Sequence, residues 1–356
     1  MKLTDKFFSL FQRDALLFFS TLLTSIVIAR QLGPEMMGIW TILLLIPGYA
    51  EAFGRLKFDV SAVYFIGKKK VGIGEVTFLL HVVALFSTVV VLSIFIVGFE
   101  WFYGQLFKNS ELDVRALAYA ILSIIPLRLI YINYSYLLIA KEDVRSYNLL
   151  VIIQALFTSV TSISMILVFD MGIMGALMGS VTGLLVSILY GMVKVQRIEK
   201  LKPSLNIKLM CEMARYAIYD YLSGLIGCFQ NSVTSLIAAV YIAPAQVAFY
   251  AVGKSICELA TRMVPAAVNT ILFPRVSKAE DSRESSMLVA RLFRVTLLIL
   301  CVSSCAVAIA IKPVIFVLYG SDYYPLIDPF LIMIPGVVLV QSASVVSSYF
   351  SGCGRP

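Results

Sequence analysis

Long runs of apolar residues alternate along this chain with short polar segments. Ten of these runs hold about 20 mainly apolar residues, the length that an α-helix needs to cross the hydrocarbon core of a membrane. The ten runs are 14–31, 36–54, 76–98, 115–139, 147–169, 171–193, 215–241, 245–272, 288–311 and 325–350. The pattern predicts an all-α fold, a polytopic transmembrane helical bundle of about ten spans. The segments 55–75, 99–114, 194–214 and 274–287 are expected to be its largest loops.

The composition supports a membrane protein. Hydrophobic residues make up 60% of the chain and charged residues only 14%, against roughly 45–50% and 25% in soluble domains. The net charge of +8 does not indicate nucleic acid, because the basic residues lie in the short gaps between apolar runs, where they act as topology signals.

The positions of lysine and arginine predict the orientation. With the N-terminus inside, 22 of the 29 basic residues fall on the inner side and four on the outer side. Positive charges in short loops are retained on the cytoplasmic side. We therefore expect a multi-pass protein of the plasma membrane with a cytoplasmic N-terminus. The triplet Lys68, Lys69 and Lys70 is interpreted as part of this inner anchor rather than as a substrate site.

An internal repeat with an offset of 210 residues is indicated by the similarity of segments 25–34 and 235–244, which share serine, alanine and proline at matching positions. Six spans precede residue 210, so both halves would enter the membrane from the same side. Such parallel repeats enclose a substrate site between two lobes. We expect a six-helix N-terminal lobe at 1–200 and a C-terminal lobe at 201–356 that holds helices seven to ten only, since the offset places an eleventh helix beyond the end of this sequence.

Several motifs resemble those of one transporter family, in the same order along the whole chain. They are Ala29-Arg-Gln-Leu-Gly-Pro-Glu-Met-Met-Gly38, Phe273-Pro-Arg-Val-Ser277, Leu318-Tyr-Gly-Ser-Asp-Tyr323 and Gly352-Cys-Gly-Arg-Pro356. The chain resembles bacterial polysaccharide flippases, the O-antigen and exopolysaccharide repeat-unit exporters of the multidrug/oligosaccharidyl-lipid/polysaccharide superfamily.

The resemblance implies a fold and a function. Such proteins have two lobes and twelve to fourteen helices, and they export undecaprenyl-diphosphate-linked oligosaccharides across the bacterial inner membrane. They work by alternating access, without ATP or a cofactor, and serve lipopolysaccharide and exopolysaccharide synthesis. The implied partners are the lipid-linked oligosaccharide, membrane lipid, a polysaccharide polymerase and a chain-length regulator, with no nucleic acid.

Cations inside the spans are candidates for binding a diphosphate, because an intramembrane charge costs several kcal/mol (roughly 2.5–3.5 on insertion scales) and is seldom kept without use. Lys254, Glu258 and Arg262 are spaced by four residues and share one helical face. They form either a cationic cavity wall or an ion-pair ladder that neutralises itself. Arg128 is the candidate partner across the cleft, or else a structural ion-pair partner of Glu51.

Two further residues are candidates for substrate binding. Arg30 ends the first span within the family motif, where it would bind substrate or extend to lipid headgroups. Asn231 would hydrogen-bond sugar hydroxyls or join helices.

Acidic residues within the spans are candidates for ion coupling, since a carboxyl in the membrane can exchange a proton as the cavity opens to either side. They are Glu258, Asp220 and Glu51, whereas Asp14 and Asp59 are expected to be solvated at the cytoplasmic interface. The single histidine, His81, is expected to have a packing role.

Other features indicate structure rather than chemistry. Gly172, Gly175, Gly179 and Gly183 recur on one helical face and predict close helix packing. The six cysteines include no CxxC pair, so no metal site is expected. The sequence has no P-loop, HExxH or GxSxG motif, which disfavours an enzyme.

Two alternatives to the polysaccharide flippase remain. One is a related exporter, either a cation-coupled multidrug exporter or a flippase for the peptidoglycan precursor. The other is a polysaccharide polymerase or ligase. A pump for cationic drugs should have a net acidic cavity, and a polymerase should present a large outer loop, so both fit this sequence less well.

Overall fold

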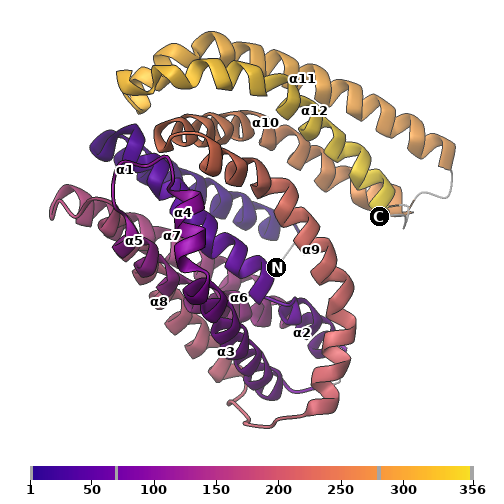
Figure 1. The fold of residues 1–356 in the computed structure, drawn as a ribbon. Helices are drawn as coiled ribbons and strands as arrows, with labels where there is room; N and C mark the ends of the chain where they lie inside the picture. Colours follow the sequence, from indigo (N-terminus) through magenta and orange to yellow (C-terminus); the bar gives the residue numbers. More distant parts are fainter. Residues whose placement is uncertain (1–2, 69–70, 279–281, 353–356) are drawn as a thin grey trace. The chain divides into compact units, whose positions relative to one another are not determined.

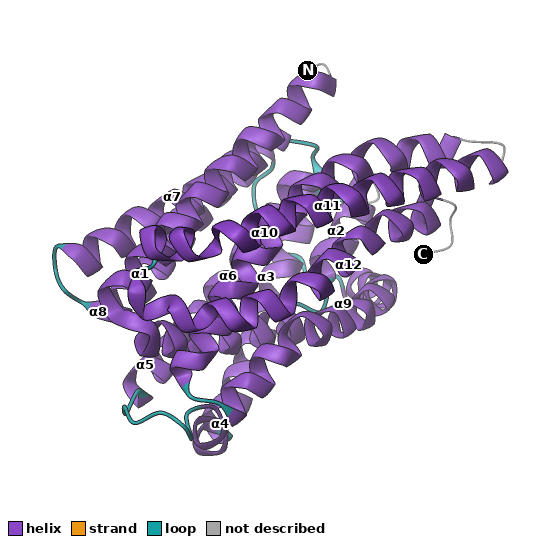
Figure 2. Cartoon of the chain, turned by 90° about the horizontal axis from the view of Figure 1, so that it is seen from above, coloured by secondary structure: helices purple, strands orange, loops and turns teal. Residues whose placement is uncertain are grey.

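A computed structural model describes residues 3–68, 71–278 and 282–352. Figure 1 shows the path of the chain, and Figure 2 shows that its described elements are helices joined by loops, without strands. The elements are α1 (Leu3–Gly54), α2 (Phe58–Gly67), α3 (Ile73–Val97), α4 (Phe99–Leu106), α5 (Arg115–Ala120), η1 (Ile121–Ser123), α6 (Ile124–Ala140), α7 (Val144–Leu167), α8 (Gly172–Ile198), α9 (Ile207–Tyr241), α10 (Pro244–Lys278), α11 (Ser282–Leu318), η2 (Ser321–Leu326) and α12 (Ile327–Gly352). The all-α prediction is confirmed.

Seven helical segments of the described chain are long and apolar enough to cross a membrane, or eight if the two arms of α9, bent by 43°, form one span. The first segment contains two predicted spans, because Gly33 interrupts α1 with a non-helical backbone (φ 75°, ψ 176°). The predicted span 245–272 lies in α10. This helix is long enough to cross a membrane but is not among the seven apolar segments, because Lys254, Glu258 and Arg262 lower its hydropathy. The chain is a multi-pass membrane protein.

The chain packs into two compact units, Met1–Val247 and Ala248–Pro356. The first unit contains α1 to α9, and the second contains α11, α12 and most of α10. The lobe boundary expected from the repeat, at residues 200 and 201, stays a prediction.

The segment 55–75, expected to be a loop, contains the buried helix α2. Leu56 and Lys57 adopt left-handed backbone conformations (φ 48° and 56°), which end α1 and start α2 in a new direction. Phe58 and Phe65 then enter the main apolar cluster of the first unit, together with Leu137 of α6. The expectation of a loop is therefore wrong for residues 58–67, because this apolar helix of 10 residues is too short to be recognised as a span. The expected loop 99–114 likewise contains the short helix α4.

Helices α7 and α8 pack closely through glycine, as predicted. A β-carbon on Gly179 would lie 2.7 Å from the carbonyl oxygen of Thr158, and one on Gly183 would lie 2.6 Å from the carbonyl oxygen of Gln154. Both distances are shorter than side chains normally allow, so these glycines permit backbone-to-backbone contact between the two helices. The turn between them is made by Asp170 and Gly172, both with positive φ.

The linker between α8 and α9 is fastened to the first turn of α3. The backbone N–H of Ile73 donates to the Glu199 carboxylate (2.8 Å), and the N–H of Lys202 donates to the carbonyl of Gly74 (3.2 Å). Asn206, which caps α9 by accepting from the N–H of Leu209, also donates to Glu75 (3.2 Å). We call residues 199–206 the strap. It joins the start of α9 to α3 by contacts at both of its ends.

Glu199 is expected to stabilise the fold in a pH-dependent way. A hydrogen bond from Lys202 and those from backbone N–H groups lower the pKa of Glu199, which also lies at the positive end of α3. Because the pKa of Glu199 is lower in the folded protein, its contribution to stability is fully present above the pKa of the unfolded state, near 4.5. This contribution is lost as the pH falls through the pKa of the folded state. Glu199→Ala should therefore lower the thermal unfolding midpoint at neutral pH by roughly 2–4 °C, for about 1 kcal/mol.

Thermal unfolding of the purified protein at neutral and acidic pH checks this expectation. The difference between wild type and Glu199→Ala should shrink at pH values below the folded pKa of Glu199. Glu212→Ala, which removes an exposed acid of α9, serves as the control. An equal loss of stability in both variants would contradict the role given to Glu199.

The second unit is a layer of three helices. Gly253 of α10 lets Phe330 and Met333 of α12 approach closely, since its β-carbon would be 3.3 Å from the Met333 methyl group. Tyr323 and Phe330 are almost fully buried there. Helix α11 runs beside α12 (Figure 1).

Candidate functional site

Arg128 of α6 and Glu51 of α1 form an ion pair inside the first unit. Nε of Arg128 donates to Oε2 of Glu51 (2.7 Å), and Nη2 lies 2.6 Å from the same oxygen in the ion pair. The two side chains remain 38% and 21% exposed, so neither is sealed in the core. This is the ion pair expected as the alternative to a free cation at Arg128. A half-exposed guanidinium in a membrane-embedded unit can exchange a carboxylate for another anion.

Two more charges belong to the same region. The charge of Lys57, at the break between α1 and α2, interacts with the carboxylates of Glu51 and Asp220. Its side chain packs on α9 at Gly224, where a β-carbon would lie 2.7 Å from the Lys57 Cε atom. Asp220 is exposed on α9. We call Glu51, Lys57, Arg128 and Asp220 the charged cluster.

Aromatic and polar contacts hold the charged cluster together. The hydroxyl of Tyr221 on α9 donates to the carbonyl of Phe53 (3.2 Å). The ring of Phe229 packs against those of Phe53 and Tyr49, with centroids 6.1 Å and 6.2 Å away. The second arm of α1 is thereby fixed along α9, so residues far apart in sequence meet at one place. Lys57 was missed as a site residue because a position in an expected loop gave no reason to select it.

A second ion pair lies deeper in the same unit. Asp59 of α2 is only 1% exposed and binds Arg55, which is 15% exposed. The expectation that Asp59 is solvated at the interface is wrong. The break at Leu56 and Lys57 turns α2 back into the protein. The sequence position of Asp59, a few residues after the end of an apolar run, does not predict this turn.

In the second unit, Lys254 and Glu258 of α10 are 3.8 Å apart, with 29% and 49% of their side chains exposed. This pair is the first step of the expected ladder. The side chain of Arg262 lies outside the described residues, as does that of Asn231 on α9. Arg30 is exposed on the first arm of α1. Of the predicted site residues, the structure brings together Glu51 and Arg128 directly, and Asp220 with them through Lys57.

His81 of α3 makes two hydrogen bonds inside the first unit. Its Nδ1 atom lies 2.6 Å from the carbonyl of Thr77, and its Nε2 atom lies 3.1 Å from the hydroxyl of Tyr134. The carbonyl can only accept, so Nδ1 carries a proton and donates. These contacts agree with the packing role expected for His81.

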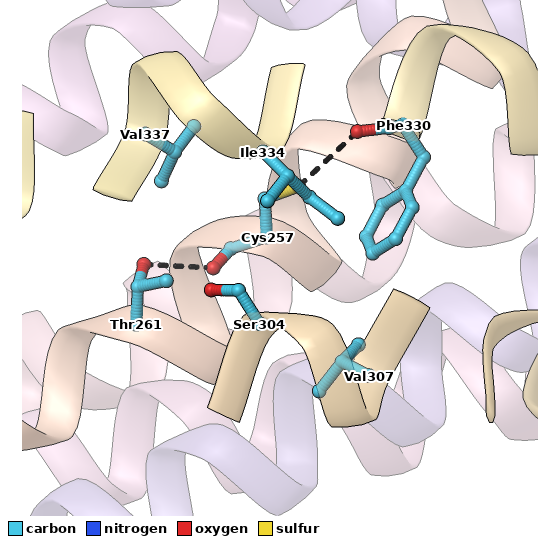
Figure 3. A pocket seen from close by; sticks show the side chains of 7 residues that line it. All are labelled: Cys257, Thr261, Ser304, Val307, Phe330, Ile334 and Val337. Carbon is cyan, nitrogen blue, oxygen red and sulfur yellow. Dashed lines mark hydrogen bonds between the residues drawn. The ribbon is translucent and has the colours of Figure 1, made fainter. Parts of the chain in front are cut away.

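Two small cavities in the described part of the chain, each of about 10 Å³, are too small for a sugar. Figure 3 shows one in the second unit, beside Cys257, Thr261 and Ser304, with Ile334 and Phe330 on its other side. Thr261 donates to the carbonyl of Cys257 (2.8 Å), and the thiol of Cys257 contacts the carbonyl of Phe330 (3.9 Å). The cavity has a volume of about 10 Å³, the least that holds one water. Within the described residues, no group of acids, cysteines and histidine is arranged to hold a metal ion.

The fold is shared with solved transporters. A multidrug resistance MATE family transporter of the MOP superfamily, in an inward-facing conformation, is 15% identical, with a TM-score of 0.77 over 95% of this chain and 81% of that one. The lipid II flippase MurJ, in an inward closed conformation, is 16% identical, with a TM-score of 0.75 over 97% and 76%. A mutant MATE transporter of Vibrio cholerae is 16% identical, with a TM-score of 0.60 over 99% and 85%.

Sequence comparison identifies the family. No curated protein matches this chain in sequence. The model of a family described as polysaccharide biosynthesis protein matches residues 5–280, which is more than half of the chain. This range includes the charged cluster, α2 and all of α10. The chain therefore belongs to the polysaccharide biosynthesis protein family and has the helical fold that MATE transporters and a lipid II flippase share.

Proposed function

We propose that this protein exports undecaprenyl-diphosphate-linked oligosaccharide repeat units from the cytoplasmic to the outer leaflet of the bacterial inner membrane. The half-exposed ion pair of Arg128 and Glu51 is the observation that carries the proposal. A flippase must offer the anionic head of its substrate a polar path while the polyprenyl tail stays in lipid. Arginine matches a diphosphate well, because its planar guanidinium binds two oxygens at once.

Glu51 has a defined part in this scheme. A guanidinium in a membrane-embedded unit is costly unless it is paired, so Glu51 holds Arg128 while the site is empty. An arriving diphosphate takes the place of Glu51 on Arg128. Lys57, whose charge already acts on Glu51, then keeps that carboxylate compensated. The cluster thus changes partners while Glu51 keeps a neighbouring cation.

The remaining residues have supporting roles in the proposal. Lys254 and Arg262 provide further cations from α10, Arg30 attracts the head at the outer surface, and Asn231 binds sugar hydroxyls. Movement is by alternating access and is ion-coupled, with Glu258, Asp220 and Glu51 as candidate carriers. The protein would act beside a polysaccharide polymerase and a chain-length regulator.

A drug exporter is the less favoured function. A cavity for cationic drugs needs an excess of acid, whereas the charged cluster contains two bases and two acids and the α10 pair contains one of each. A peptidoglycan-precursor flippase has the same need for a diphosphate site, so the charges alone do not separate it from a polysaccharide flippase.

Complementation tests the proposal. The gene is expressed in strains that lack their own repeat-unit flippase and make different surface polysaccharides, and surface polysaccharide is measured by immunoblot. We expect polysaccharide to return in at least one strain. If none responds while the same gene restores growth to a strain without its peptidoglycan-precursor flippase, or raises resistance to cationic drugs, the corresponding alternative replaces the proposal.

A further inference from the structure

Asp59 is the one charged side chain that is fully buried among those whose burial is described. Its Oδ2 atom accepts a hydrogen bond from Nε of Arg55 and forms an ion pair with Nη2, which itself makes no hydrogen bond. Its other oxygen, Oδ1, is buried and accepts no hydrogen bond, although the N–H of Val60 is close enough to favour the carboxylate electrostatically. A buried carboxylate oxygen without a hydrogen-bond partner is unfavourable, because the desolvation of its charge is not compensated. A proton on Oδ1 would remove the charge that causes this cost.

Arg55 keeps a second contact that does not depend on Asp59. Its guanidinium carbon lies 4.7 Å from the ring centroid of Tyr136 on α6, a cation–π geometry. A cation–π contact is stronger where the cation is shielded from water. Arg55 therefore keeps one favourable contact as a cation when Asp59 becomes neutral, although its charge is then no longer balanced by an anion.

The ion pair spans a strained break in the helix. Arg55 follows the last residue of α1, Asp59 lies in the first turn of α2, and Leu56 and Lys57 between them both have left-handed backbones. This conformation is strained for a non-glycine residue and persists only where surrounding contacts enforce it. The attraction between Arg55 and Asp59 draws the two helix ends together across the break. It is therefore one of the forces that maintain the bend.

The charged groups around Asp59 oppose cation binding, and only its burial favours the neutral acid. Arg55 and Lys57 both favour the carboxylate from the break itself, and their positive charge also disfavours a metal cation there. From the neighbouring helices, Tyr136 of α6 contacts Arg55, while Asp220 of α9 and Glu51 act on Lys57. A cavity of about 10 Å³ lies next to Arg55, between α2, α3 and α6, and has Asn133 as its other polar lining residue. It is at the lower limit for one water, which could bring a proton to this region.

We propose that Asp59 is a proton-binding residue of the first unit and that its protonation releases the bend between α1 and α2. One proton from water binds Oδ1, the carboxylate becomes a carboxylic acid, and the ion pair changes from net zero to +1. Arg55 stays on Tyr136, and Leu56 and Lys57 lose the attraction that holds them strained. The inference rests on the proposed ion-coupled export. Asp59 is not among the candidate carriers Glu258, Asp220 and Glu51, and a proton bound to it would change the bend between α1 and α2.

Infrared difference spectroscopy tests the proton site without any substrate. The whole protein in lipid nanodiscs is titrated between about pH 4 and pH 9, and the band of a protonated carboxyl in a dry environment is followed. We expect this band in wild type and in the control Asp14→Asn, whose acid is 64% exposed. It should be absent in Asp59→Asn. A band that persists in Asp59→Asn, or no such band in wild type, would overturn the inference.

A charge exchange separates proton binding from a purely structural ion pair. The double variant Arg55→Asp/Asp59→Arg keeps a pair across the break but moves the carboxyl from α2 to the residue that follows α1. We expect wild-type abundance and export that no longer responds to a pH gradient. Wild-type pH dependence in the double variant would show that the pair is only structural. If the infrared band is present but no strain is complemented, the proposed function fails while the proton site stands.

Discussion

Replacing Arg128 with alanine is expected to lower surface polysaccharide in a complemented strain about tenfold or more at matched protein abundance. The substitution removes the cation proposed to bind the diphosphate and leaves Glu51 without its partner. A tenfold effect corresponds to about 1.4 kcal/mol, which is modest for losing one side of a charge pair in a partly desolvated site. Immunoblots of polysaccharide and of the tagged protein provide the measurement.

Further variants show whether Arg128 binds substrate or only supports the fold. Arg128→Lys keeps the charge but loses the bidentate geometry, so it should retain only part of the activity. Arg115→Ala is the matched control, since Arg115 forms an ion pair with Glu100 in which both side chains are more than half exposed. If Glu51→Ala/Arg128→Ala exports as well as wild type, the pair is structural and the proposed diphosphate site is wrong.

The second large effect is expected at the contact between α7 and α8. Gly183→Leu should lower the thermal unfolding midpoint by roughly 5–10 °C and reduce the protein in the membrane. The side chain has no space, because even its β-carbon would come within 2.6 Å of the Gln154 carbonyl oxygen and 2.9 Å of the Thr158 backbone nitrogen. A small side-chain movement cannot relieve contact with backbone atoms, so the helices must separate.

Gly48→Leu is the matched control for this prediction. Gly48 is also a helical glycine within a membrane span, but a β-carbon there would meet no atom within 4 Å. Protein abundance and thermal midpoint are measured for both variants. Equal losses in the two would mean that leucine at any glycine of these helices destabilises the protein, and that the α7–α8 contact has no special importance.

Hydrophobic patterning predicted most of the helices but not where the chain bends inside the protein. A run of 20 apolar residues has few alternatives to a membrane helix, so spans such as 147–169 and 171–193 agree with α7 and α8. Gly54 ends α1, but the two residues that turn the chain, Leu56 and Lys57, are neither glycine nor proline and do not predict a left-handed backbone. As a result, α2 was expected to be loop and Asp59 to be solvated.

The candidate site was predictable only in part. The ion pair of Arg128 and Glu51 could be predicted from the sequence, because an arginine within the membrane needs an acidic partner and few acids lie within the spans. Lys57 could not, since its approach to α9 depends on the left-handed backbone at its own position. The spacing of four residues placed Lys254 and Glu258 on one face of α10, and a distance of 3.8 Å between them agrees with that.

The strap also bears on how this protein can change in evolution. Glu199, Lys202 and Asn206 make their contacts with backbone or side-chain atoms of Ile73, Gly74 and Glu75, about 130 positions earlier in the chain. Gly74 leaves no room for a β-carbon beside the Lys200 carbonyl. Two segments that are far apart in the sequence are therefore expected to coevolve. A substitution tolerated in one would select for compensation in the other, and second-site suppressors of a damaged linker should map to the first turn of α3.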